Sequence, residues 1–82
     1  MLSKKTFKQQ IKRLSILYPN WRVDISDKDT MKVWYNEFKE MNDEQFEVAI
    51  EEYINNEVYT PTIAGIKNQK TYRLPKRKDE FL

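Results

Sequence analysis

The chain begins with a pattern that is typical of an amphipathic helix. Apolar side chains recur every three or four residues after Ser3, a favourable N-cap residue, and basic side chains fill the other face. Pro19 disfavours helical geometry in the residue before it, so this helix is expected to end near Tyr18. The apolar positions that define its buried face are Phe7, Ile11, Leu14, Leu17 and Tyr18.

Two further patterns with the same spacing predict two more helices. Ser26, Asp27 or Asp29 can cap the second helix, and Asn42 can cap the third. Gln45 lies three residues after Asn42, which makes a variant of the capping box. The two apolar faces consist of Met31, Trp34, Tyr35, Phe38 and Met41, and of Phe46, Ala49, Ile50, Tyr53 and Ile54.

The segment between the first two helices is expected to be an extended connector. Trp21, Val23 and Ile25 alternate with polar residues, as in a short strand. No second alternating run exists to pair with them, and a single strand is not stable alone. We therefore interpret the segment as a connector that places Trp21 and Val23 against the helices.

A short fourth helix and a basic end complete the predicted fold. Thr60 is expected to be the N-cap and Pro61 the first helical residue, with the helix running to about Lys70. The charged run that follows has no apolar periodicity, which predicts disorder. The sequence thus predicts an all-α protein, a compact bundle of three main helices and a short fourth at residues 1–70, with a flexible basic tail at residues 71–82. Short connections favour antiparallel neighbours.

The composition lacks the usual catalytic and metal-binding groups. The chain has no histidine, no cysteine and a single glycine, Gly65. This excludes the commonest general base, a thiolate zinc site and a glycine-rich phosphate loop. Paired carboxylates such as Glu47 and Glu51 are expected on an outward helix face, where they are solvated rather than catalytic. We expect no enzymatic activity, no cofactor and no metal.

The same composition predicts a cytoplasmic protein. No apolar run approaches the roughly 20 residues of a membrane span. The basic N-terminus is not followed by the apolar stretch of a signal peptide. The absence of cysteine fits a reducing compartment. No contact with a membrane is expected.

The net charge of +2 hides an uneven distribution along the chain. Residues 1–23 carry six basic and no acidic side chains, and residues 24–57 carry three basic and eleven acidic ones. Residues 58–82 carry six basic and two acidic side chains. Such an order can steer a charged partner. Alternatively, the basic and acidic helices face one another within the molecule or present their charges to solvent.

The tail combines aromatic and aliphatic side chains with basic ones. This composition suits a segment that folds onto a groove of a partner protein. It also suits nucleic acid, because aromatic rings stack on bases and basic groups meet phosphates. A simple solubilising end is the third interpretation. The candidate partner-binding residues are Tyr72, Arg73, Leu74, Lys76, Arg77, Lys78, Phe81 and Leu82.

Four features occur in an order that resembles a known family. They are Tyr18-Pro19-Asn20-Trp21, the aromatic second helix with Val33-Trp34-Tyr35 and Phe38, the acidic third helix, and Tyr59-Thr60-Pro61-Thr62-Ile63-Ala64-Gly65-Ile66. Over about residues 7–68 the chain resembles the phage replicative helicase loaders and inhibitors. In that family a compact helical N-terminal domain precedes a flexible C-terminal segment. The members bind the hexameric DnaB-type replicative helicase, hold it inactive and help deliver it to the phage origin, usually with an origin-bound phage protein.

The resemblance implies a phage DNA-replication protein that acts in the cytoplasm of a bacterial host. It would bind the replicative helicase, or a helicase-loader protein, and control its loading or activity. The family's C-terminal segment, which is assigned to the helicase contact, is usually longer than the tail here. The tail, the helical body or a different partner therefore remain alternatives. The motif residues Pro19, Pro61 and Trp34 are expected to be structural.

The alternative hypothesis is a small helical DNA-binding protein. Three helices and basic ends permit it, as does the isoelectric point of 8.8. However, a recognition helix usually exposes basic and amide side chains, whereas the third helix here is acidic and would repel phosphate. Direct contact with nucleic acid is thus a secondary expectation.

Overall fold

Four helices account for most of the chain that the structure describes. The computed structural model describes residues 1–69, and no strand occurs within that range. The all-α prediction is confirmed. The tail predicted at residues 71–82 lies outside the described residues. The helices are α1 (Lys4–Leu17), α2 (Lys28–Phe38), α3 (Asp43–Asn56) and α4 (Ile63–Lys67).

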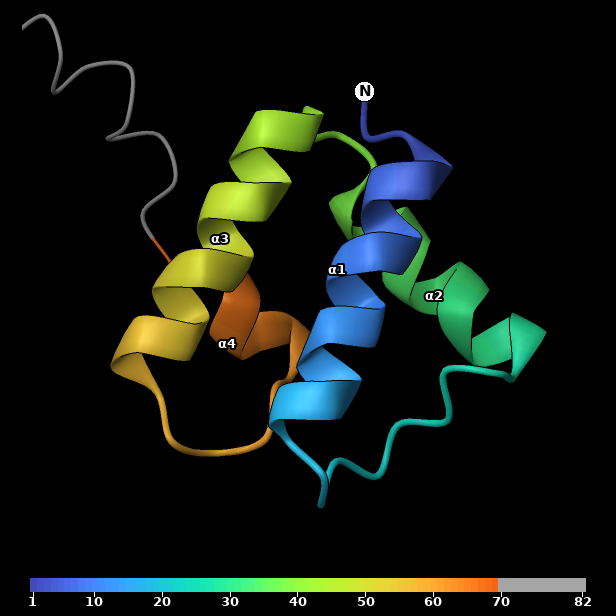
Figure 1. Ribbon diagram of the computed structural model, residues 1–82. Helices are drawn as coiled ribbons and strands as arrows, with labels where there is room; N and C mark the ends of the chain where they lie inside the picture. Colours follow the sequence, from blue (N-terminus) through green and yellow to red (C-terminus); the bar gives the residue numbers. More distant parts are fainter. Residues whose placement is uncertain (70–82) are drawn as a thin grey trace, which may run out of the picture.

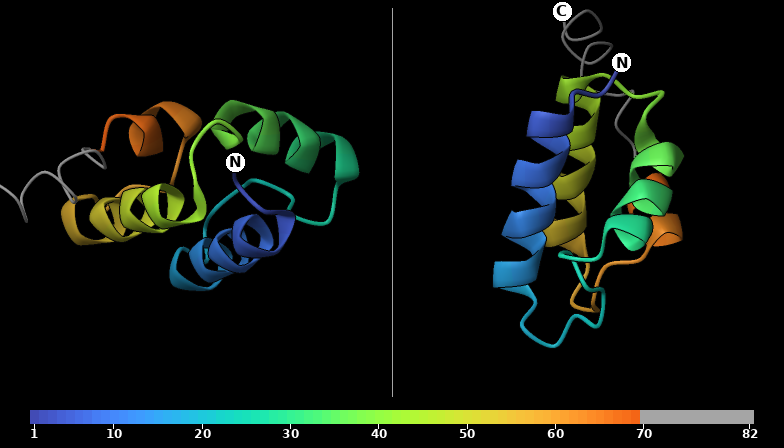
Figure 2. Two further views of the ribbon diagram at one scale, coloured as in Figure 1. Left: turned by 90° about the horizontal axis from the view of Figure 1, so that it is seen from above. Right: turned by 90° about the vertical axis from the view of Figure 1, so that its right-hand side faces the viewer.

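The helices form two layers (Figures 1 and 2). α1 and α3 lie side by side and run parallel, and α2 and α4 cover one face of this pair. α2 runs in the opposite direction to both, as the short connections predict. At the far end of the pair, the Tyr18 hydroxyl after α1 donates a hydrogen bond to the Glu57 carbonyl after α3 (3.1 Å).

The core forms where the two layers meet. The Phe46 ring of α3 lies 5.2 Å from the Phe38 ring of α2 and 5.8 Å from the Phe7 ring of α1, measured between ring centroids. Trp34 is buried as expected and packs edge-on against Trp21, with centroids 5.5 Å apart. The side chains with the least exposure are Phe38, Phe46, Leu2, Ile11, Leu14, Ile50 and Ile66.

The predicted starts of α1 and α3 are confirmed, and for α2 the structure selects Asp27 among the three candidates Ser26, Asp27 and Asp29. The Ser3 side chain accepts a hydrogen bond from the first turn of α1, and the Asp27 side chain does the same for α2. At α3 both halves of the capping box form between Asn42 and Gln45. These starts follow from interactions within three residues, which is why the sequence alone reveals them.

The connector between α1 and α2 is extended, as predicted. Trp21 packs against the core, and its indole N–H donates a hydrogen bond to the Pro61 carbonyl (2.8 Å). Val23 and Ile25 are partly buried against the same core. The connector between α1 and α2 is therefore hydrogen-bonded to the segment that precedes α4.

The predicted start of α4 is wrong by two residues. The N-cap is Thr62 rather than Thr60, and Ile63 rather than Pro61 is the first helical residue. The Thr60 carbonyl accepts a hydrogen bond from the Tyr53 hydroxyl (3.0 Å), and the Pro61 carbonyl accepts one from the Trp21 indole N–H (2.8 Å). These tertiary hydrogen bonds keep the segment extended until Thr62.

The predicted end of α4 is also wrong, because the helix ends at Lys67 rather than near Lys70. The Asn68 amide donates to the Ala64 carbonyl, and the Gln69 amide then donates to the Ile66 carbonyl only three residues back. Such a tightened last turn commonly ends a helix by satisfying its final carbonyls.

Two leucines differ from the sequence pattern. Leu17 was assigned to the buried face of α1 but is 49% exposed, because it lies on the last turn, beyond the part of α1 that α2 covers. Leu2 precedes the helix, yet it is buried. The Leu2 amide donates to the Lys39 carbonyl and its own carbonyl accepts from the Tyr35 hydroxyl (2.6 Å). Hydrogen bonds from the Leu2 backbone to the Tyr35 side chain and to the C-cap of α2 thus fix Leu2 in the core.

One carboxylate joins the N-terminal ends of α1 and α3. Asp43 accepts hydrogen bonds from the Ser3 amide (2.7 Å), the Ser3 hydroxyl (3.0 Å) and the Thr6 hydroxyl (3.0 Å). The bond from the Ser3 amide is the main cause that lowers the pKa of Asp43 below its ordinary value of 3.8. These hydrogen bonds favour the charged form in the folded state.

The lowered pKa of Asp43 indicates that the stability of the fold decreases in acid. Because the pKa is lower in the folded state, Asp43 stabilises the fold above pH 3.8, and this contribution is lost as the pH falls through the lowered pKa. The Asp43→Asn variant is expected to melt at a lower temperature than the native chain at neutral pH. The difference is expected to shrink below pH 3.8. Thermal unfolding followed by circular dichroism across this pH range measures both.

The matched control is Glu44→Gln, which removes the same charge from the same turn of α3. Glu44 is exposed, and none of the hydrogen bonds and ion pairs seen within residues 1–69 involves it. Equal losses for the two variants, or a loss at Asp43 that is independent of pH, would show that the hydrogen bonds from Ser3 and Thr6 contribute nothing specific.

Candidate protein-binding surfaces

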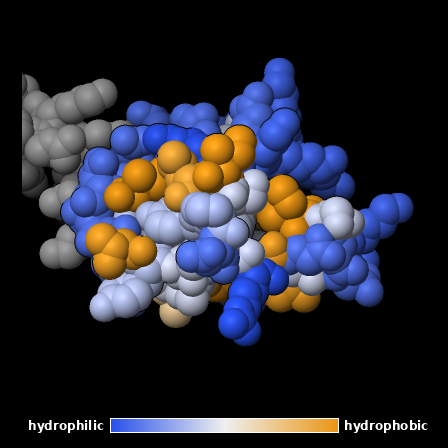
Figure 3. All heavy atoms as spheres, turned by 60° about the horizontal axis from the view of Figure 1, so that its bottom comes forward, coloured by the Kyte–Doolittle hydropathy of each residue, from blue (hydrophilic) through white to orange (hydrophobic). Residues whose placement is uncertain are grey.

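The described part of the chain contains no clustered ligands for a metal. Within residues 1–69, no group of three or more histidine, cysteine, aspartate or glutamate residues is placed to hold a metal ion. None of the helices in that range is both long enough and apolar enough to cross a membrane. Glu47 and Glu51 are exposed on α3, as predicted, and Glu51 accepts a hydrogen bond from Arg13 (2.7 Å). The candidate sites of the described chain are two surfaces, a groove between α1 and α2 and an apolar end of the molecule (Figure 3).

The charge pattern is satisfied within the molecule only in part. Arg13 of α1 pairs with Glu51 of α3, and Lys67 of α4 pairs with Glu37 of α2. No other ion pair between side chains joins residues within the described range. Most of the lysines of α1 and α2 therefore keep their charge available for a partner.

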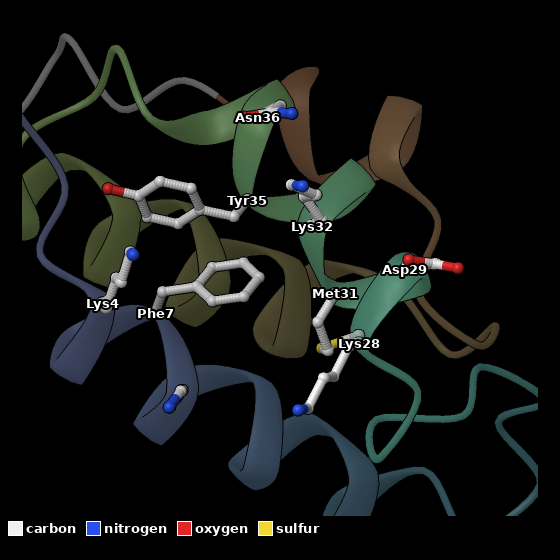
Figure 4. Close-up of a pocket in the computed structure, with 9 residues that line it drawn as sticks. Lys4, Phe7, Lys28, Asp29, Met31, Lys32, Tyr35 and Asn36 are labelled. Atoms are coloured by element: carbon white, nitrogen blue, oxygen red, sulfur yellow. The ribbon is translucent and has the colours of Figure 1, made fainter.

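A groove with a volume of about 560 Å³ opens between α1 and α2 (Figure 4). We call it the basic groove. Its floor is apolar, its rim is formed by lysines from both helices, and Asp29 and Asn36 border it on α2. The floor consists of Phe7, Met31 and Tyr35, and the rim lysines are Lys4, Lys8, Lys28 and Lys32.

The floor of the basic groove is held rigidly by the core beneath it. Phe7 is only 3% exposed, and the Tyr35 ring meets it edge-on with centroids 5.4 Å apart and planes at 82°. The Tyr35 hydroxyl donates to the Leu2 carbonyl, which fixes the ring in place. Met31 is partly buried beside them and adds a flexible, polarisable side chain. The groove is therefore formed before any ligand binds.

The rim of the basic groove carries a concentrated positive charge. Lys4 and Lys8 are four residues apart on α1, Lys28 and Lys32 are four residues apart on α2, and all four are exposed. Figure 4 shows Lys28 reaching towards α1, whereas the carboxylate of Asp29 points away from the groove. The charge that a ligand would meet is thus strongly positive.

A second surface lies at the end of the molecule where α1 stops and the loop after α3 returns. Figure 3 shows apolar side chains gathered on this end. Among the exposed side chains here, Ile16 is 68% and Val58 is 85% exposed. Tyr59 is 74% exposed. The last turns of α1 also line a smaller hollow of about 390 Å³, beside Ile16 and Leu17.

The predicted partner-binding residues, at positions 72–82, lie outside the described residues, so their role stays a prediction. The sequence pattern did not reveal the basic groove. It did show lysines opposite the apolar face of the first helix, and the second helix carries two lysines with the same spacing. That spacing was the available signal, but only the packing of α1 against α2 brings the two pairs together.

The fold and the groove define a small two-layer, all-helical domain with a preformed hollow between α1 and α2. The family model for the N-terminal domain of the phage gp39 protein matches residues 2–67, and the chain belongs to this family of phage helicase loaders and inhibitors. The resemblance seen in the sequence motifs is thereby confirmed. No curated protein and no solved structure shows a significant match.

Membership defines the general role of the chain. It is a helicase-related replication protein of phage type, from a family of regulatory proteins that bind a helicase. The matched region spans all four helices, from the residue before the first N-cap to the last residue of α4. The described helical body is therefore the family's domain.

Proposed function

We propose that this protein binds a DnaB-type replicative helicase, or the loader of that helicase, and controls loading or activity without catalysing a reaction itself. The observation that carries the proposal is the family match over residues 2–67. The preformed groove and the unpaired lysines of the helical body support a role in binding. In this role the protein acts in the cytoplasm of the bacterial host, together with an origin-binding phage protein.

The direct test is binding between purified components. The full chain is immobilised, and the purified hexameric helicase of the host and its loader are passed over it separately at low salt. We expect one of them to bind saturably. The proposal is wrong if neither binds at low ionic strength, where electrostatic attraction is least screened. The helicase's ATPase and unwinding rates, measured with and without the protein, then distinguish inhibition from activation.

We further propose that the basic tail at residues 71–82 contributes to this contact. Its support is compositional: Tyr72, Phe81 and Leu82 supply apolar anchors among basic side chains. Deleting residues 72–82 is expected to weaken helicase or loader binding about tenfold or more, equivalent to about 1.4 kcal/mol. Surface plasmon resonance measures the affinity, and far-ultraviolet circular dichroism checks that the helices persist.

The matched control for the deletion is a chain whose last eleven residues are shuffled, which keeps the charge and composition of positions 72–82. Loss of binding in both altered chains supports recognition of the tail's sequence. If the shuffled chain binds like the native one, the tail acts through its charge and composition rather than through its sequence. If the deletion leaves the affinity unchanged, the tail is not part of the contact and the helical body carries it.

A further inference from the structure

We propose that the basic groove binds an acidic, amphipathic segment of the partner protein. The apolar side chains of that segment would lie on the floor formed by Phe7, Met31 and Tyr35, and its carboxylates would meet the rim lysines. The inference deepens the proposed function, on which it rests for the identity of the partner. It places a contact in the helical body, separate from the tail.

The first argument is the charge of the rim. Each helix contributes two lysines one turn apart, and like charges at this spacing repel one another. The packing of α1 against α2 then brings these two pairs to opposite sides of one groove. None of the four lysines forms an ion pair with another residue of the described chain. An anionic ligand would relieve this repulsion.

The second argument is the chemistry of the floor, which favours a peptide over nucleic acid. Phe7 is almost fully buried, so the accessible part of the floor comes mainly from the partly buried Met31 and Tyr35, and the unbranched Met31 side chain has no ring on which a base can stack. The Tyr35 hydroxyl is already bound to the Leu2 carbonyl, so it is not a free donor for phosphate. What remains is an apolar surface that suits aliphatic or aromatic anchors. A helix with apolar residues on one face and acids beside them satisfies both floor and rim.

The third argument concerns the acidic helix of a second copy of this chain. α3 is the acidic element of the described chain, and its exposed positions include Glu44, Glu47, Glu51 and Asn55. The apolar side chains of α3 that are buried, such as Phe46 and Ile50, lie in its own core. A second copy would therefore bring carboxylates to the rim without anchors for the floor. A partner segment with both features fits better.

The test uses the full chain and a labelled helical peptide of about twelve residues, with Leu and Phe on one face and Glu along both edges of that face. Fluorescence anisotropy gives the affinity for the native chain and for two charge-matched variants. The groove variant is Lys8→Glu with Lys32→Glu. The control variant is Lys5→Glu with Lys12→Glu, two exposed lysines of α1 that do not line the groove.

We expect the groove variant to bind the peptide about tenfold more weakly or worse, because two attractions become repulsions, and the control variant to change about threefold at most. A peptide with Ser in place of Leu and Phe is expected to lose about tenfold as well, because the floor no longer contributes. The groove variant is expected to melt no lower than the native chain, since repulsion on both helices is reduced.

Four results of the binding assay would overturn the proposal. They are no saturable binding of the peptide, equal weakening in the groove and control variants, equal binding of the Ser-substituted peptide, and groove-dependent binding of an oligothymidylate of similar length in place of the peptide. Sedimentation of the native chain as a dimer that the groove variant disrupts would assign the groove to a second copy, which also contradicts it.

The helicase-binding assay separates this inference from the proposed function. If the groove variant captures helicase or loader as well as the native chain does, the groove is not the contact, while the proposed function stands. If the native chain captures neither protein but binds the acidic peptide through the groove, the proposed function fails and the groove is upheld as a site for acidic segments.

Discussion

Replacing Phe46 with alanine is expected to destabilise the domain by about 3–5 kcal/mol, the range for removing a large aromatic side chain from a core. Phe46 is fully buried and its ring lies between those of Phe7 and Phe38, so it joins all three long helices. A domain of this size has a total stability of only about 4–12 kcal/mol. The variant should therefore lose at least about a quarter of the total stability, and at the lower end of that range it should be largely unfolded at room temperature.

Urea unfolding followed by circular dichroism measures this loss. The control is Val58→Ala, which shortens a side chain that is 85% exposed and is expected to change the free energy of unfolding by at most about 0.5 kcal/mol. A cooperative Phe46→Ala variant that loses less than about 1 kcal/mol would contradict the ring arrangement, because it would mean that the three helices do not meet at this residue.

Replacing Gly65 with alanine is expected to destabilise the domain, although alanine is the better helix former. An added Cβ would lie 2.8 Å from Cε1 of Tyr53 and 3.0 Å from Oγ1 of Thr62. The Tyr53 ring cannot easily move, because its hydroxyl donates to the carbonyls of Tyr59 and Thr60, each at 3.0 Å. Overpacking costs about 1–3 kcal/mol and the gain in helix propensity is at most about 1, so we expect a net loss of about 1–2 kcal/mol.

A double-mutant cycle tests this cause. The cost of Gly65→Ala is measured by urea unfolding in the native chain and again in a Tyr53→Leu background, which removes the ring that the new Cβ would meet. We expect the cost to fall in the second background, since the two positions are in contact. A Gly65→Ala variant that is more stable than the native chain, or a cost equal in both backgrounds, would show that the close approach to Tyr53 does not determine the effect.

Hydrogen bonds from Tyr53 and Trp21 explain why the start of the fourth helix was predicted wrongly. Thr60-Pro61 is a good local start, because proline at the first helical position needs no hydrogen-bond acceptor. In the structure the Tyr53 hydroxyl and the Trp21 indole take the carbonyls of Thr60 and Pro61. Both donors are distant in sequence or belong to another element. The local pattern therefore predicted that a helix exists here, but tertiary hydrogen bonds make Ile63 rather than Pro61 its first residue.

For the basic groove, too, the sequence predicts a part of the site and the packing of the helices decides the rest. The sequence contains Lys4 and Lys8, and Lys28 and Lys32, each pair with the spacing of one helical turn. That spacing predicts that each pair lies on one side of its own helix. It does not say that the two sides oppose each other above Phe7, because this depends on the angle and rotation at which α1 and α2 pack.

The sequence by itself determined the helical class, the three long helices with the N-caps of the first and third, and the family through its ordered motifs. These properties depend on residues a few positions apart, where hydrogen bonds and apolar periodicity act locally. The tertiary structure alone decided the parallel pairing of α1 and α3, the late start of α4 and the joining of four lysines around one apolar floor. These depend on which faces pack together, and packing is set by the shapes of side chains that are far apart in the chain.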